Sequence, residues 1–598
     1  MTLAVLPLLL ATLAGAADDR NAAVEKVVNS FVRPGLVSMP IGVTRKGTSI
    51  WCVAEPSAFL PEEQRLRSVI LAGVDGDPET VEALRARRDS PALGTANSEQ
   101  WSRAWIPIAN PDAWYDCAFE SGQPRPLVFP PRGSAYNTPA EQESAILCRF
   151  LEWFAPDAVV EVLPADDPDL RESREKNLLI GRVDRLAGNS SGWDVANRVQ
   201  LPSVRIPAGL LKSDPTDWDN FTRSYTNIVQ IDGTSRSHSP VSRNAIARLQ
   251  RPPLEVARRL LDVYGHKLNP VMYQPALALM ARLEFADQTG DAQHRQGVET
   301  ILTPYLTGER SSLDEKSGGS HFAGQLIFAA WAHATGDKRA IPLVKAAADR
   351  GFDANGQPRE AMPTHSEMSD AVFMACPILC EAGVLSGDPK YIDFALQHLK
   401  FMQGHCLRDD GLYRHSPLCE TPWGRGNGFP ALGLALSLSA LQPIVDQPHA
   451  DTAAEDPLRS AAIKTHAQML ASYRAHLQAL LAHQDPTRAW RQVVDHPGSY
   501  RELTATCMMT FAIARGLRMG WLDEATYRPV VDRSWRAISL RVYDDGVLID
   551  VCTGTGKQKS LQDYLDREAI LGRDERGGAM ALIAAVEIHR LQAEHPSR

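Results

Sequence analysis

Residues 370–403 read DAVFMACPILCEAGVLSGDPKYIDFALQHLKFMQ, and this stretch decides the fold of the longer part of the chain. An apolar run from Asp370 ends at the turn Ser386-Gly387-Asp388, and a second periodic run extends from Tyr391 to Gln403. Glycine suits the left-handed position after a helix, and the Asp that follows it suits the cap of the next helix. The stretch therefore predicts two helices joined by a tight turn.

The same unit recurs earlier in the chain. The apolar segment 271–290 ends in Thr289-Gly290-Asp291, and the segment 321–336 ends in Thr335-Gly336-Asp337. Recurring helical hairpins predict a solenoid or a closed ring. The uneven spacing of the turns argues against a regular tetratricopeptide array and favours a closed α/α toroid. We expect residues 246–598 to form this all-α domain.

Before residue 245, short apolar runs alternate with turn residues and helical patterns. Strands are expected over residues 36–43, 50–54, 68–74, 104–108 and 158–163, and helices over 78–88 and 139–154. This alternation predicts a mixed α/β domain with a mainly parallel sheet, over residues 17–245. The polar, irregular chain from 164 to 245 is interpreted as the end of that domain plus a linker.

The first residues have the pattern of a signal peptide. An apolar run from Leu3 to Leu13 is followed by Ala14-Gly15-Ala16 and then by Asp18-Asp19-Arg20. The run is short for a membrane span, and the small residues suit cleavage. We expect residues 1–16 to be a signal peptide and the protein to be secreted or periplasmic. The alternative is an apolar first helix of the fold.

Charge and cysteine content exclude several classes of protein. Lys plus Arg number 63 against 72 Asp plus Glu, a net charge of -9, which argues against a nucleic-acid or anionic-membrane partner. Nine cysteines are too sparse for a disulfide scaffold, and an odd number leaves at least one unpaired. Cys376 and Cys380 lie on an apolar helical pattern and are expected to be buried thiols. Because no CxxC or HExxH motif occurs, we expect no zinc site.

The segment 365–429 is richest in groups that bind sugars or acids. The string Trp423-Gly424-Arg425-Gly426-Asn427-Gly428-Phe429 sets an indole, a guanidinium and a carboxamide on a backbone with three glycines. Arg binds carboxylates in bidentate fashion, Trp stacks on sugar faces, and glycine lets a ligand come close. The alternative is a tight turn with a structural Arg.

Several motifs, taken together and in order, resemble one family. They are Ser369-Asp370-Ala371-Val372-Phe373-Met374, Gly387-Asp388-Pro389-Lys390-Tyr391, His415, the string 423–428, Trp490-Arg491-Gln492, Ser499-Tyr500-Arg501-Glu502 with Thr504-Ala505, Gly520-Trp521-Leu522-Asp523, Asp545-Gly546 and 551–556. Residues 250–590 resemble the unsaturated rhamnogalacturonyl hydrolases, glycoside hydrolase family 105. The resemblance implies a six-hairpin (α/α)6 toroid, which agrees with the repeat pattern.

The resemblance also implies a chemistry. Such enzymes take oligosaccharides from pectin or rhamnogalacturonan whose non-reducing end is a 4,5-unsaturated galacturonyl residue, and they hydrate the C4=C5 bond. Asp370 matches the acid/base residue. The substrate-binding residues that we carry over or expect nearby are His321, His365, His415, Trp423, Arg425, Asn427, Phe429 and Trp490. No metal or cofactor is implied, and no nucleic acid or membrane is expected as a partner.

One feature of the chemistry stays open in the sequence. A helix N-terminus favours the ionised form of Asp370, whereas an acid must hold its proton part of the time. Related enzymes place a second Asp nearby, but His321 stands at that place here. A neutral His321 could relay the proton, it could be a core histidine, or the missing carboxylate could be Asp314, Glu315 or Glu367. Phe429 also replaces a Trp of the family.

The first domain has a weaker resemblance, to zinc carboxypeptidases of the succinylglutamate desuccinylase type. It rests on residues 70–80, on Asn110-Pro111-Asp112 and on Pro131-Arg132. Asp75 stands where a zinc-binding His is needed, Glu79 is displaced, and the strand 160–163 has no His. We therefore expect a carboxypeptidase-like fold without its metal; the alternative is an unrelated α/β domain.

Other functions remain open from the sequence. The toroid suits an epimerase or an enzyme that cleaves intact chains, because such folds host many reactions. The departures at His321 and Phe429 would suit a non-catalytic carbohydrate-binding protein. A peptidase acting through the first domain is the least favoured reading.

Overall fold

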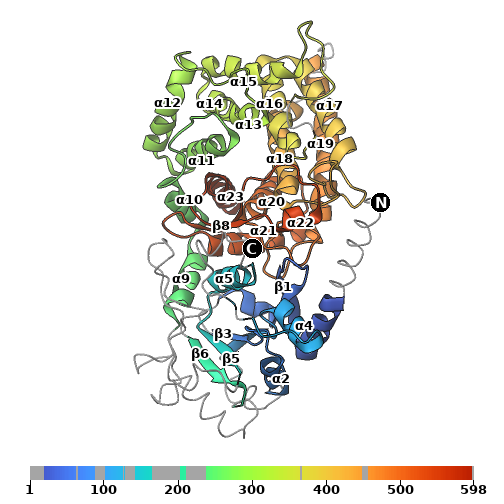
Figure 1. Ribbon diagram of the computed structural model, residues 1–598. Helices are drawn as coiled ribbons and strands as arrows, with labels where there is room; N and C mark the ends of the chain where they lie inside the picture. The colour runs from blue at the N-terminus through green and yellow to red at the C-terminus, as the bar shows by residue number, and fades with distance from the viewer. Residues whose placement is uncertain are drawn as a thin grey trace, which may run out of the picture. The chain divides into compact units, whose positions relative to one another are not determined.

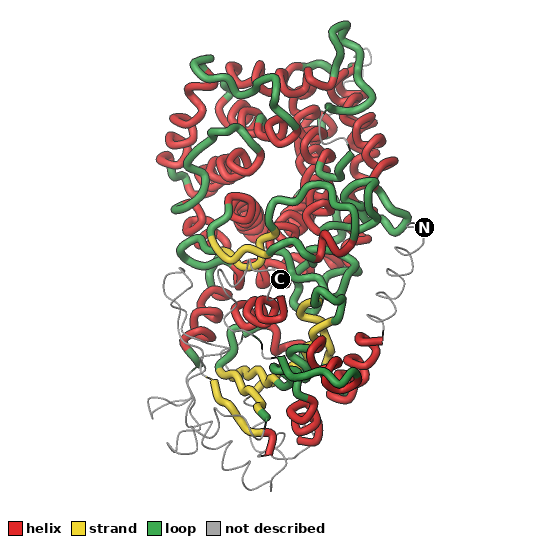
Figure 2. The backbone as a smooth tube through the Cα atoms, in the orientation of Figure 1, coloured by secondary structure: helices red, strands yellow, loops and turns green. Residues whose placement is uncertain are grey.

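The computed structural model describes residues 19–61, 65–87, 101–125, 127, 142–164, 203–209, 238–363, 367–447 and 456–594 (Figures 1 and 2). The chain divides into two compact units. The first comprises Met1–Gln250 with His496–Tyr500, and the second comprises Arg251–Asp495 with Arg501–Arg598. The expected signal peptide, residues 1–16, lies outside the described residues.

The first unit contains a six-stranded sheet in the order β1-β2-β4-β3-β5-β6. Its strands are β1 Val37–Val43, β2 Ser49–Ala54, β3 Leu66–Leu71, β4 Trp101–Ile106, β5 Ala158–Leu163 and β6 Ser203–Pro207. Pairs β3–β4, β3–β5 and β5–β6 are parallel, and pairs β1–β2 and β2–β4 are antiparallel. The prediction of a mixed α/β domain with a mainly parallel sheet is confirmed.

Helices cover this sheet and complete its core. They are α2 Pro78–Arg87, α4 Pro111–Phe119, α5 Gln142–Phe154 and α9 Pro240–Gln250, and residues 19–31 are also helical. Val53, Ile70 and Val160 of the strands share one buried cluster with Val81 and Trp114 of the helices. Such burial of β-branched and aromatic side chains is what fixes a strand face against a helix.

The expected linker between 164 and 245 contains regular structure. Strand β6 pairs in parallel with the buried strand β5, and helix α9 begins at Pro240. Strand β6 belongs to the end of the domain, which agrees with the interpretation, whereas helix α9 was not expected. The alternation Val204-Arg205-Ile206 is too short to predict a strand by itself, and pairing with β5 fixes its structure.

The second unit is mainly helical (Figure 1). Its α-helices are α10 Pro253–Leu261, α11 Tyr273–Thr289, α12 Ala292–Leu306, α13 Gly319–Gly324, α14 Leu326–Thr335, α15 Ile341–Ala348, α16 Ala371–Ser386, α17 Pro389–Cys406, α18 Gly424–Val445, α19 Pro457–Leu481, α20 Leu503–Arg518, α21 Glu524–Arg541, α22 Leu561–Leu565 and α23 Glu575–Glu594. Strands β7 Leu548–Cys552 and β8 Ala569–Gly572 form a small antiparallel sheet.

The predicted turns between helices are confirmed. Gly290, Gly336 and Gly387 follow α11, α14 and α16 with φ of 71°, 74° and 70°, the left-handed conformation that glycine adopts without strain. The next residue in each turn is an Asp whose side chain accepts a hydrogen bond from a backbone N–H two residues on. These caps end one helix and start the next.

One set of helices packs in a closed series. Helix α11 packs on α13 and α14, these pack on α16, and α16, α18, α20 and α23 then follow in order. Helix α23 packs back on α11, so the series closes on itself. The remaining long helices pack on members of this series: α12 on α11, α15 on α14 and α16, α17 on α16, α19 on α18, α21 on α20, and α10 on α23 and α11. Helix α18 is long and apolar enough to cross a membrane, but 72% of its most apolar window is buried inside the unit, as in a core helix.

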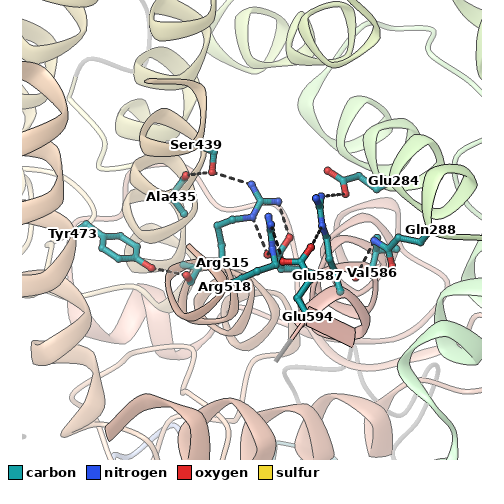
Figure 3. A network of polar contacts seen from close by, with 12 residues as sticks. Glu284, Gln288, Ala435, Ser439, Tyr473, Arg515, Arg518, Val586, Glu587 and Glu594 are labelled. Atoms are coloured by element: carbon teal, nitrogen blue, oxygen red, sulfur yellow. Dashed lines mark hydrogen bonds and ion pairs between the residues drawn. The ribbon is translucent and has the colours of Figure 1, made fainter. Parts of the chain in front are cut away.

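A buried ionic network joins the C-terminal halves of α18, α20 and α23, three helices of the closed series (Figure 3). The Arg515 guanidinium of α20 donates to both carboxylate oxygens of Glu587 on α23, at 2.8 and 2.6 Å, and Arg518 donates to the same carboxylate at 2.9 Å. Arg515 also donates to Ser439 Oγ on α18 at 2.9 Å. Burial alone would raise the pKa of Glu587, but Arg515 and Arg518 outweigh it and lower the pKa to about 2.

All nine cysteines lie in the described part of the chain, and each is a free thiol. Cys376 and Cys380 are fully buried in the core of the second unit, as predicted. Burial raises the pKa of both thiols, which keeps them protonated and unreactive.

Candidate active site

Asp370 stands at the N-terminal cap position of α16, but its carboxylate does not cap the helix. The caps of α12, α17, α19 and α21 are also Asp residues, and each of those side chains accepts a backbone N–H. Asp370 makes no such bond among the described residues and is 7% exposed. A buried carboxylate that is not used to stabilise its own helix must have another partner.

The partner is His415, whose Nε2 lies 3.3 Å from Asp370 Oδ1. Neither atom has a hydrogen bond of good geometry to any described residue, although both are buried. Ser369 Oγ and Trp423 Nε1 are buried and unsatisfied in the same way. Unpaired buried polar atoms are costly, and their gathering around one carboxylate is typical of a site completed by a ligand.

His415 is fixed on its other side by aromatic residues. Its Nδ1 lies 2.8 Å from the Tyr564 hydroxyl, and its ring packs on Trp423 with centroids 4.5 Å apart. Its backbone carbonyl accepts the Ser369 N–H at 2.9 Å, which joins the loop of His415 to the start of α16. His415, Trp423 and Tyr564 are each at most 1% exposed. The imidazole is therefore held in one orientation.

Arg425 lies in the first turn of α18 and is bound to the protein itself. Its Nη1 and Nη2 donate to the carbonyls of Cys552 and Thr553 at 2.8 Å each, and its guanidinium stacks on Trp423 at 4.6 Å. Glu502, the cap of α20, accepts the Cys552 N–H at 2.9 Å. Arg425 thus anchors the loop after β7; its expected contact with a substrate carboxylate stays a prediction.

Tyr273 lies close enough to Arg425 and to Asp370 for both to shift the pKa of its phenol. It is the first residue of α11, and burial raises the pKa of its phenol, an effect that Arg425 opposes and Asp370 reinforces. Its ring meets Phe429 edge-on at 5.6 Å, and Phe429 stacks on Phe373 at 5.5 Å. Phe429 is 1% exposed, so it packs among these rings, and its expected role in binding substrate stays a prediction.

Two other predicted residues are engaged within the protein. The Asn427 amide donates to the carbonyls of Tyr413 and Trp423 and accepts the Tyr413 N–H, so both its donor hydrogens are used. Trp490 is fully buried, and its Nε1 donates to the Leu480 carbonyl at 2.8 Å. Both residues stabilise the loops around the site, and a direct contact with substrate stays a prediction for each.

The histidines expected near Asp370 have different positions. His321 accepts the Gly318 N–H through Nδ1 at 3.2 Å and so helps to cap α13. The structure gives it no contact with Asp370 among the described residues, and its substrate role stays a prediction. His365 lies outside the described residues.

None of the candidates for a second carboxylate contacts Asp370 in the described structure. Asp314 is exposed and binds Ser317 Oγ and the Lys316 N–H in its own turn. Glu315 is exposed as well. Glu367 is exposed and forms an ion pair with Lys557, which lowers the pKa of Glu367 and makes it a poor acid.

Gly426 leaves the room that the cluster needs. A Cβ at this position would lie 2.9 Å from Ser369 Oγ, 3.3 Å from Trp423 Cε3 and 3.4 Å from His415 Cδ2. We expect Gly426→Ala to displace the Ser369 hydroxyl beside Asp370 and to press on the Trp423 ring, and so to lower kcat by roughly tenfold, because small misplacements near catalytic groups are costly. Steady-state kinetics check this, with Gly404→Ala as the control, since nothing lies within 4 Å of a Cβ there. Equal activity of the two variants would contradict the expectation.

His398 positions the residue that follows Asp370. Its Nδ1 accepts the Met362 N–H at 3.2 Å, so the proton on Nε2 is donated to the Ala371 carbonyl at 3.0 Å. His398 is fully buried, and this burial lowers its pKa to about 4. The ring is therefore neutral in the folded protein and serves as one donor and one acceptor.

Stability should accordingly fall in mild acid. The unfolded chain binds a proton at His398 below pH 6.5, whereas the folded protein binds one only near pH 4. The contribution is thus present above pH 6.5 and is lost as pH falls toward 4, by about 3 kcal/mol. Urea unfolding across this range measures the loss. His398→Gln, which keeps a neutral donor and acceptor, should remove this share; an unchanged pH dependence would contradict the assignment.

The described residues of the first unit contain a His–Asp pair, in which His238 Nδ1 lies 3.2 Å from the buried Asp157 carboxylate and 3.3 Å from Ser242 Oγ. Glu79 is exposed, and the Asp75 carbonyl accepts the Arg125 N–H. No group of three or more His, Cys, Asp or Glu that could hold a metal occurs among the described residues of the whole chain. The likeness of this unit to zinc carboxypeptidases stays a prediction.

Comparison with known proteins adds the family. The model of Glycosyl Hydrolase Family 88 matches residues 262–592, more than half of the chain. The chain belongs to glycosyl hydrolase family 88. The resemblance inferred from the motifs around Asp370 and Arg425 is thus confirmed for this part of the chain.

Relatives within this hydrolase family match over part of their length. The unsaturated 3S-rhamnoglycuronyl hydrolase of Alteromonas sp. (strain LOR) is 25% identical over 30% of this chain and 42% of that protein. The unsaturated rhamnogalacturonyl hydrolase YesR of Bacillus subtilis is 28% identical over 24% of this chain and 34% of that protein. The chain spans less than half the length of these curated relatives.

Solved structures are similar to part of the chain. A possible member of glycoside hydrolase family 105 from Salmonella enterica has a TM-score of 0.46 and 19% identity, over 58% of this chain and 93% of that one. A family 88 protein from Bacteroides vulgatus has a TM-score of 0.45 and 18% identity, over 57% of this chain and 98% of that one.

Proposed function

We propose that this protein removes a 4,5-unsaturated galacturonyl residue from the non-reducing end of oligosaccharides derived from pectin or rhamnogalacturonan. The observation that carries the proposal is the Asp370 carboxylate, which is buried beside His415 and takes no part in capping its own helix. The family membership and the relatives that act on unsaturated uronates support the choice of substrate class.

The proposed reaction hydrates a vinyl ether. Asp370, in its protonated form, gives its proton to C4 of the unsaturated ring, and water adds at C5 while Asp370 takes a proton back from it. The hemiketal formed at C5 then opens by breaking the bond from C5 to the ring oxygen, which leaves a ketone at C5 and a hemiacetal at C1. Collapse of this hemiacetal to an aldehyde breaks the bond from C1 to the glycosidic oxygen, and the next sugar leaves as an alcohol. No atom of the protein becomes covalently bound to the sugar, so one acid/base residue is sufficient.

The charges at the N-terminal ends of the helices in the closed series favour the binding of a negatively charged sugar. Tyr273, Asp370, Arg425, Glu502 and Arg576 lie at or next to the N-terminal ends of α11, α16, α18, α20 and α23. Helix N-termini carry partial positive charge and favour an anion. Arg425 and Arg576 each lower the pKa of the Tyr273 phenol, whereas Asp370 raises it, so these charges all act at the position of this ring. The helix N-termini together with Arg425 and Arg576 would stabilise the carboxylate of a bound uronate. The positive charge of this region therefore does not require a second acidic side chain from the protein.

We further infer the six-hairpin toroid for the second unit. The closed series of inner helices, each with an outer helix packed on it, supports this arrangement. We also propose a secreted or periplasmic location, on the strength of the pattern in residues 1–16 alone.

The experiment is to mix the purified protein with lyase digests and to follow the ultraviolet band of the unsaturated uronate. A steady fall with the rhamnogalacturonan digest is the expected result. Loss of the band only with digests of other uronate polymers would assign the protein to those polymers instead of to rhamnogalacturonan. Tight binding of oligosaccharides with no loss of the band in any digest would contradict the enzymatic function and would indicate a carbohydrate-binding protein.

A further inference from the structure

Tyr564 is the residue that lies behind His415, on the side away from Asp370. It belongs to the short helix α22 and is fully buried. Its hydroxyl lies 2.8 Å from His415 Nδ1, and it also accepts the Gln558 N–H at 3.3 Å. These are its two hydroxyl partners among the described residues. Asp370, His415, Tyr564 and the Gln558 amide thus form one chain of polar contacts.

The hydrogen-bond partners in this series of polar contacts determine which atoms of Tyr564 and His415 carry protons. Burial raises the pKa of Tyr564, so the residue is a neutral phenol with a single proton. Because Gln558 donates to the phenol oxygen, the phenol proton is directed to His415 Nδ1. An imidazole that accepts at Nδ1 carries its own proton at Nε2, and Nε2 is the atom 3.3 Å from Asp370 Oδ1.

A second proton on His415 is disfavoured by the same geometry. It would sit on Nδ1 and face the phenol oxygen, and the phenol hydrogen would then have no acceptor among the described residues. A doubly protonated imidazole would also hold Asp370 as a carboxylate, which cannot act as an acid. A neutral Nε2–H places no positive charge beside Asp370 and leaves its carboxyl group able to take up and release a proton.

We propose that Tyr564 is a positioning residue that keeps His415 in the neutral Nε2–H form, so that the group 3.3 Å from Asp370 Oδ1 is an uncharged N–H and not an imidazolium. The inference rests on the proposed function for its catalytic meaning. This arrangement explains how a single Asp works without a second carboxylate nearby: the neighbouring imidazole carries no positive charge that would hold Asp370 ionised.

The variant Tyr564→Phe keeps the ring and removes the donor. In this variant Tyr564 no longer disfavours a proton on Nδ1 of His415. We expect kcat to fall by roughly tenfold or more in mild acid and to recover as the pH is raised, with KM changed much less. The ionisable groups that act on the Tyr564 phenol, and that must be considered in fitting the profile, are Cys419, Asp370 and Asp563. Arg425 must be considered as well, because it stacks on Trp423, whose ring packs on His415.

Tyr473→Phe is the matched control. Tyr473 is equally buried, and its hydroxyl donates to the Ala512 carbonyl away from the site. This variant should lose stability comparable to that lost by Tyr564→Phe but keep the wild-type kcat and pH profile. A Tyr564→Phe enzyme that is folded and keeps the wild-type profile overturns the proposal.

Two further measurements separate this inference from the proposed function. In a His415→Gln background, where the amide is a donor at every pH, adding Tyr564→Phe should produce no new pH dependence. A new pH dependence in the double variant would overturn the proposal. ¹⁵N NMR of labelled histidine, with His415→Gln to assign the signal, reads the tautomer without any substrate. A proton on Nδ1 of wild-type His415 overturns the proposal even if the enzyme is active, and a proton on Nε2 supports it even if no uronate is consumed.

Discussion

Asp370→Asn should lower kcat on an unsaturated oligosaccharide by about 10²- to 10⁴-fold, the usual contribution of a general acid or base. Asparagine has the shape of the carboxylate but cannot deliver a proton to carbon or accept one from water. The loss should appear in kcat, because the substrate contacts around the site remain. Steady-state kinetics with the ultraviolet assay measure it.

The fold should survive this substitution. The Asp370 side chain makes no capping bond to a described residue, so no helix cap is lost, and Asn is itself a good residue at a cap position. Asp388→Asn is the matched control, because Asp388 caps α17 through the Lys390 N–H and lies outside the cluster. It should keep both kcat and stability. An Asp370→Asn enzyme with wild-type activity would remove Asp370 from the mechanism.

Glu587→Gln should be the most destabilising of the conservative substitutions considered. It leaves Arg515 and Arg518, whose side chains are 9% and 8% exposed, without their shared counter-charge. Removing one partner of a buried ion pair costs about 3–5 kcal/mol. The free energy of unfolding, from urea denaturation, should fall by that amount. Because the pKa of Glu587 is about 2 in the folded protein, against an ordinary value of 4.5, the stabilisation is present above pH 4.5 and is lost as pH falls toward 2.

Glu594→Gln is the control for this network. Glu594 also pairs with Arg518, but its side chain is 40% exposed, so the loss should stay below about 1 kcal/mol. Figure 3 shows both carboxylates beside Arg518. Equal effects of the two substitutions would mean that the buried pair does not hold α20 and α23 together. Folded Glu587→Gln protein should keep kcat, since the network lies at the end of these helices opposite to Asp370.

Local signals predicted the helices of the second unit well. The Gly–Asp turns encode both the end of one helix and the cap of the next, and the structure has both features at Gly290, Gly336 and Gly387. The first unit was harder, because strand β6 exists only through its pairing with β5. Val204-Arg205-Ile206 alternates apolar and charged residues, but an alternation over three residues is too short to predict a strand.

The site shows the same division between local and long-range information. Asp370 and His415 stood out from motifs, and the structure brings them to 3.3 Å. Tyr564 was missed because it lies 149 residues from His415 and no pattern connects the two. Arg425 was expected to face the substrate, whereas its donors reach carbonyls of the loop after β7, a contact 127 residues away in the sequence. The type of a side chain indicates which groups it can bind, whereas its actual partner depends on which distant residues the fold brings next to it.

The most direct test of the central claim uses a pair of oligosaccharides that differ only in the terminal uronate, unsaturated in one and saturated in the other. Loss of the ultraviolet band and release of the next sugar are measured together for each. Hydration of the double bond predicts that the two events proceed at one rate with the unsaturated compound, and that the saturated compound is not cleaved. Cleavage of the saturated compound at a comparable rate, or release of sugar with the band retained, would contradict it.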